Sequence, residues 1–84
     1  MWSASIRVVD EDGNPVSGAK VGVHFSSPWS YDNQYTDDDG WAHFEYDSID
    51  SGKRMFVDDL YVNVQHVAED FFLENGDTES FTLP

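Results

Sequence analysis

Residues 6–25, IRVVDEDGNPVSGAKVGVHF, decide the fold class. Apolar and polar side chains alternate on both sides of the acidic turn at residues 10–15. A period of two is typical of β-strands that have one face on a core and the other toward water. The Asp-Gly pair in the turn indicates a hairpin, because a tight turn needs positive φ values. This stretch therefore predicts two strands joined by a turn.

The same alternation recurs along the chain, at residues 41–46, 60–65 and 81–83, between turn clusters at residues 26–28, 37–40 and 74–77. No stretch of helical length has a period of 3.6, and only residues 67–73 leave their structure open. Short strands at this spacing predict an all-β fold, an Ig-like antiparallel Greek-key β-sandwich of about seven strands. We expect its core to contain Ile6, Val8, Val21, Val23, Phe25, Phe44, Tyr46, Val62, Val64 and Phe81.

Size and charge limit the function. The chain has 84 residues, which suits a single domain at residues 1–84, and its 17 acidic against 4 basic residues give a net charge of −13. Such a balance repels phosphates, so we expect no nucleic-acid partner. The absence of cysteine excludes disulfides and thiolate sites. No apolar run is long enough for membrane insertion, and residues 1–10 lack the apolar core of a signal peptide.

Two motifs indicate a family. The pattern xDxxGxPVxGAxV in residues 9–21 is followed by TDxDG in residues 36–40. Together they resemble the carboxypeptidase regulatory-like domains, prealbumin-like (transthyretin-like) sandwiches that include collagen-adhesin B-type repeats. The resemblance implies a seven-stranded sandwich of the kind used in adhesin stalks, enzyme appendages, carbohydrate-binding units and spike extensions. The chain lacks the motifs of the prealbumin-like hydrolases and dioxygenases, so we expect it not to be an enzyme.

Metal sites are weak candidates in this sequence. His24 and His43 have the parity opposite to the apolar residues of their strands, whereas His66 has the parity of Val62 and Val64, so we expect no three-histidine zinc site. Calcium prefers oxygen ligands, and its candidates here are Asp12, Asp37 and Asp39. The chain has no complete calcium loop, so we favour hydrogen-bonded turns without a cofactor.

The aromatic residues are the better candidates for binding. Trp29, Tyr31 and Tyr35 fall in a predicted loop at residues 26–35, and Trp41 follows the next turn. Exposed flat rings bury much area at little entropic cost, so they suit protein or sugar partners. The alternative is that the loop caps a small core.

The features of the sequence favour a non-catalytic structural or interaction module. Such a module would serve as an accessory or spacer domain, or as a small subunit of a cell-surface, secretion-spike or phage-tail-type assembly. The alternative is a carbohydrate-binding module that uses the aromatic loop, with or without calcium. The expected partner is therefore a protein with basic residues, a larger parent assembly or a neutral glycan.

Overall fold

The computed structural model describes residues 1–26 and 30–83, and all of its regular elements are strands. In chain order they are β1 (Trp2–Val9), β2 (Lys20–Phe25), β3 (Ser30–Tyr35), β4 (Trp41–Tyr46), β5 (Met55–Val62), β6 (Gln65–Leu73) and β7 (Thr78–Thr82). The all-β prediction is confirmed. The described residues include no helix that is long and apolar enough to cross a membrane.

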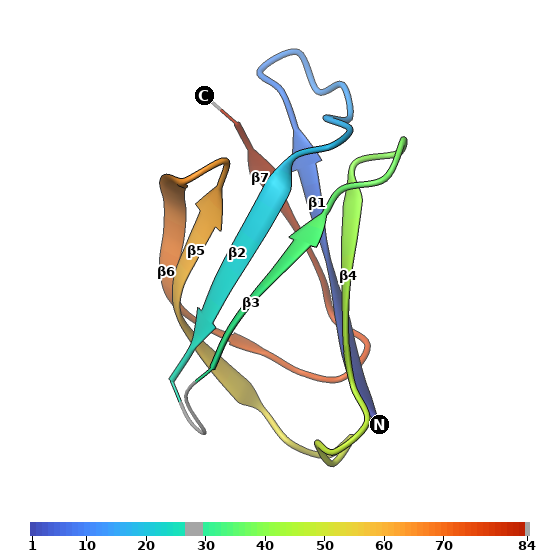
Figure 1. Ribbon diagram of the computed structural model, residues 1–84, viewed down its shortest axis with the longest axis vertical. Coiled ribbons are helices and arrows are strands. Elements are labelled where there is room, and N and C mark those ends of the chain that lie inside the picture. The colour runs from blue at the N-terminus through green and yellow to red at the C-terminus, as the bar shows by residue number, and fades with distance from the viewer. Residues whose placement is uncertain (27–29, 84) are drawn as a thin grey trace.

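The strands form two packed sheets (Figure 1), one with the order β4-β1-β7 and the other with the order β3-β2-β5-β6. All pairs are antiparallel except β1–β7, which is parallel. The turn at residues 10–15 closes a short antiparallel bridge between Val9 and Pro15, but it does not join β1 and β2 into a hairpin, because these strands belong to different sheets. The two ends of the chain lie at opposite ends of the longest axis of the molecule, whose extent is 36 Å.

The core lies between the sheets, and Thr36 is the one buried polar residue among those that the structure describes. Seven of the ten predicted core residues are buried, and Tyr46 and Phe81 pack against the core while partly exposed. Trp2 is a core residue that the prediction missed. It is fully buried, its ring contacts those of Phe25 and Tyr46, and its Nε1 donates to the carbonyl of Lys53 at 2.9 Å.

The prediction of Val64 as a core residue is wrong, since 85% of it is exposed. The chain reverses between β5 and β6 at Asn63 and Val64, which both have positive φ values of 51° and 63°. Asn63 holds this turn against β2, because it donates to the carbonyl of Lys20 and accepts from its N–H through Oδ1. When a prediction extends the alternation of one strand across a turn, it assigns every later residue to the wrong face of the sheet.

Two further expectations about secondary structure change. Residues 67–73, which the sequence left open, continue β6 as far as Leu73. The predicted loop at residues 26–35 contains strand β3, whose sequence SYDNQY lacks an apolar alternation. A strand at the edge of a sheet tolerates polar side chains at inward positions, because they reach water around the edge.

Candidate functional site

The predicted aromatic site is divided between opposite faces of the sandwich. Tyr31 and Tyr35 pair with His24 and Lys20 of β2 and point outward from the four-stranded sheet, with 52% and 65% of their surfaces exposed. Trp41 pairs with Arg7 of β1 on the three-stranded sheet, at an outward position beside the buried Ala42. Trp29 lies outside the described residues. The turn at residues 36–40 carries the chain from one sheet to the other, so the four rings do not form one patch.

The outer face of the four-stranded sheet carries aromatic side chains from all four strands, and we call it the aromatic face. His24 contacts Tyr31, with ring centroids 6.1 Å apart. The corresponding distances are 5.2 Å for Tyr61 and His66, and 4.9 Å for Phe56 and Phe72. The aromatic face therefore consists of His24, Tyr31, Tyr35, Phe56, Tyr61, His66 and Phe72.

Gly22 shapes the β2–β3 side of the aromatic face. A Cβ atom at this position would collide with the hydroxyl of Tyr31. The glycine thus lets the phenol ring lie close against the sheet, although a glycine within a strand has an entropic cost.

The charges at the centre of the aromatic face are acidic. His66 Nε2 is 3.0 Å from Asp59 Oδ1, and His24 Nδ1 is 3.9 Å from Asp59 Oδ2. Glu69 pairs directly with Asp59 across β5 and β6, an arrangement of like charges that destabilises a sheet. Arg54 lies at one end of the face, with its Cζ 4.1 Å from the centroid of Phe72. The centre of the face therefore favours a cationic partner.

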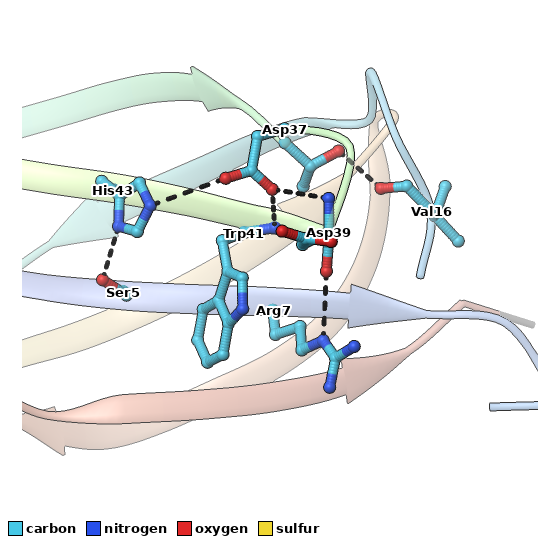
Figure 2. Close-up of polar contacts among 8 residues, drawn as sticks. Ser5, Arg7, Val16, Asp37, Asp39, Trp41 and His43 are labelled. Atoms are coloured by element: carbon cyan, nitrogen blue, oxygen red, sulfur yellow. Dashed lines mark hydrogen bonds and ion pairs between the residues drawn. The ribbon is translucent and has the colours of Figure 1, made fainter. Parts of the chain in front are cut away.

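A second candidate surface lies around Trp41 on the outer face of the three-stranded sheet (Figure 2). The indole lies across β1, beside the imidazole of His43, with the two rings within 13° of parallel and their centroids 6.5 Å apart. An open pocket of about 170 Å³ is lined by Ser5, Trp41, His43 and Thr78. The Cζ of Arg7 is 5.8 Å from the indole centroid. We call these five residues the Trp41 platform.

The turn before β4 fixes the position of the platform. Asp37 Oδ1 accepts hydrogen bonds from the N–H groups of Trp41 and Asp39, each at 2.9 Å. The hydrogen bond from the N–H of Trp41 is the main cause that holds the pKa of Asp37 below its usual value. Burial acts in the opposite direction, whereas the N–H of Asp39 and the nearby His43 also lower this pKa. Asp39 in turn accepts from Arg7 Nε through its backbone carbonyl, at 3.2 Å.

The calcium candidates do not meet in one place. Asp37 Oδ1 accepts hydrogen bonds from the backbone of its own turn, and Asp37 Oδ2 is 3.8 Å from His43 Nε2. Asp12 belongs to the other acidic turn, at residues 10–15. In that turn Asp10 Oδ1 accepts from the N–H groups of Asp12 and Asn14, as Asp37 does in its own. Within residues 1–26 and 30–83, no three His, Asp or Glu side chains are grouped so that they could hold a metal ion.

The histidines also differ from the expectation. His24 and His43 point outward as predicted, but His66 shares the face of His24, because the turn at Asn63 and Val64 changes its parity. The sequence analysis did not find the aromatic face or the Trp41 platform, to which these histidines belong. Cross-strand neighbours such as Asp59 and His24 lie 35 positions apart in the sequence.

The imidazole of His43 lies between Ser5 and Asp37. Ser5 Oγ and His43 Nδ1 are 2.7 Å apart and hydrogen-bonded. The 3.8 Å between His43 Nε2 and Asp37 Oδ2 is longer than a hydrogen bond, and Asp37 Oδ1 is already occupied by backbone donors. These contacts therefore hold the imidazole beside Trp41.

Comparisons of the chain with models of protein families, with curated proteins and with solved structures find no match.

Proposed function

We propose that this chain is a non-catalytic interaction module with a prealbumin-like fold, which docks through its aromatic face onto a partner protein with basic residues. The observation that carries the proposal is the exposure of the aromatic face. Three of the five most exposed large apolar side chains in the described residues, namely Tyr31, Tyr35 and Phe72, lie on it. Tyrosine, phenylalanine and arginine are enriched at protein interfaces, and the aromatic rings bury a large area at low entropic cost.

Charge supports a basic partner. Asp59 and Glu69 face each other at the centre of the aromatic face, and a Lys or Arg side chain between them would offset their repulsion and contact the neighbouring rings. The net charge of −13 would also speed the approach of a basic protein and would oppose the pairing of two copies of this chain.

The course of the chain supports a role as a spacer or accessory domain. The chain enters at one end of the 36 Å axis and leaves at the other (Figure 1), so the domain would separate whatever is joined to its two ends. The sequence motifs at residues 9–21 and 36–40 resemble domains with such roles in cell-surface and exported assemblies. We place the protein in an assembly of this kind.

A photo-crosslinking amino acid at single positions tests the proposal in the cells that make the protein. It is introduced at Tyr35 or Phe72 on the aromatic face and, as a control, at Glu45, which is exposed on the opposite face. We expect the two aromatic positions to crosslink to the same protein through a basic segment, and the position of Glu45 to give no such adduct. The double variant Tyr31→Ser, Tyr35→Ser should lose the complex while its stability changes little, since both side chains are more than half exposed.

Two results would refute the proposal. The first is the absence of a shared adduct at the two aromatic positions. The second is an adduct that forms equally well from the position of Glu45, because contact would then not depend on the aromatic face.

A further inference from the structure

We propose that the Trp41 platform is a second binding site, on the face opposite the docking surface, and that it binds one ring of a neutral saccharide chain. The five residues of the platform come from three strands: Ser5 and Arg7 from β1, Trp41 and His43 from β4, and Thr78 from β7. The site does not depend on Trp29, Tyr31 or Tyr35.

The shape of the platform suits a pyranose ring. Trp41 and His43 present two nearly parallel rings side by side, and Figure 2 shows both on the same side of β1. The C–H groups on one face of a pyranose are weakly positive and stack on the negative face of an indole. The pocket of about 170 Å³ is smaller than the roughly 300–1,000 Å³ of pockets that enclose a drug-sized ligand. It would therefore hold a single ring while the rest of a chain runs across the open sheet.

The polar groups of the platform suit hydroxyl groups. Ser5, Thr78 and His43 line the pocket together with the indole of Trp41. A hydroxyl or an imidazole can exchange hydrogen bonds with sugar hydroxyls, which are both donors and acceptors. His43 is hydrogen-bonded to Ser5, and Arg7 donates a hydrogen bond to the carbonyl of Asp39, so these groups are largely in place before a ligand arrives.

The charge around the platform favours an uncharged ligand. Of the positions on β1, β4 and β7 that alternate outward, only Glu45 is a carboxylate, in a chain with 17 acidic residues. The other polar residues at these positions are Ser3, Ser5, Arg7, His43, Thr78, Ser80 and Thr82. Two other carboxylates lie near these strands: Glu79 is exposed on the edge strand β7, and Asp37 Oδ2 is 3.8 Å from His43 Nε2. An anionic sugar would be opposed by the net charge of −13, whereas a neutral sugar would not.

The experiment titrates the ¹⁵N-labelled protein with neutral hexasaccharides of β-1,4-glucose, β-1,4-xylose, β-1,4-mannose and α-1,4-glucose, and with hexagalacturonate as the charged probe. We expect at least one neutral hexasaccharide to give saturable NMR shifts at the Trp41 indole and the His43 ring, while Trp2 stays unchanged because it is fully buried. Hexagalacturonate should bind at least tenfold more weakly.

Two variants identify the site. Trp41→Ala and His43→Ala should each weaken binding at least fivefold, and the control variant Gln65→Ala, on an exposed residue of the other sheet, should bind as the wild type does. His43 is exposed, so His43→Ala tests the site even if Trp41→Ala fails to fold.

Three outcomes would overturn the inference: no saturable shift with any neutral probe at 10 mM, tighter binding of hexagalacturonate than of all neutral probes, or unchanged binding by His43→Ala. None of these outcomes bears on the docking of a protein to the aromatic face, which crosslinking tests separately.

Discussion

The turn between β5 and β6 gives the sharpest stability prediction, which is that Val64→Gly stabilises the protein. Val64 is a β-branched residue with a φ of 63°, a left-handed conformation that such residues rarely adopt. Asn63, with a φ of 51°, precedes it, so the pair forms a two-residue hairpin turn in which Asn-Gly is the preferred sequence. Val64 is 85% exposed, so its removal leaves no cavity.

The expected gain is a difference between two terms. A left-handed conformation costs an L-residue about 1–2 kcal/mol, and glycine avoids this cost. Glycine makes the unfolded chain more flexible, which costs roughly 0.5–1 kcal/mol. The difference runs from about 0 to about 1.5 kcal/mol, and its middle value of about 0.7 kcal/mol raises the melting temperature of a domain of this size by about 3–6 °C.

Chemical denaturation with urea, followed by tryptophan fluorescence to which the buried Trp2 contributes, measures this change. Gln65→Gly is the matched control, because Gln65 is the next residue, is exposed and lies in the extended strand β6. That variant should lose about 0.5–1 kcal/mol, since its backbone gains nothing from glycine. A loss of stability in Val64→Gly comparable with that of the control would show that the turn is not strained.

Three further predictions concern charge and solution conditions. The melting temperature should rise with sodium chloride from 10 mM to 1 M, because salt screens the repulsion within a chain of net charge −13; a flat or falling curve would contradict this. Calcium at 1 mM should stabilise the protein no more than sodium chloride of equal ionic strength, and a saturable gain lost in Asp37→Asn would indicate a calcium site. Burial and the hydrogen bond to Asp32 raise the pKa of Tyr46 above its usual value of about 10, so the neutral phenol is favoured in the folded state. Its contribution to stability is therefore complete below about pH 10 and is lost as the pH rises further, and alkaline unfolding of Tyr46→Phe should lack this component.

Much of the fold could be predicted from local patterns. Alternation in residues 6–9 and 19–25 indicates strands with one buried face, and Ile6, Val8, Val21 and Val23 are buried as expected. Trp2 could have been found by extending the same alternation backward through Ala4, since the burial pattern of β1 is regular from Trp2 to Val9. A period of two is a local property of the backbone, so neighbouring residues are sufficient to show it.

One error occurs where the chain turns without a conventional signal. Asn63-Val64 lacks the glycine that marks most two-residue hairpins, so the alternation of β5 continues in the sequence past the turn and assigns Val64 and His66 to the wrong faces. Strand β3 was missed for a related reason, since its polar sequence is stable only as the edge partner of β2.

The sequence by itself determined the strand content, most of the core and the acidic character of this protein, because each depends on composition or on near neighbours. Only the tertiary structure decided which aromatic side chains share a surface. The chain crosses from one sheet to the other at residues 36–40, so Tyr35 and Trp41 lie on opposite faces although six positions separate them. Ser5 and Thr78, 73 positions apart, meet beside Trp41 because β1 pairs with both β4 and β7. Pairing between distant strands is a property of the whole chain, and for that reason the two candidate binding surfaces appear only when the sheets are assembled.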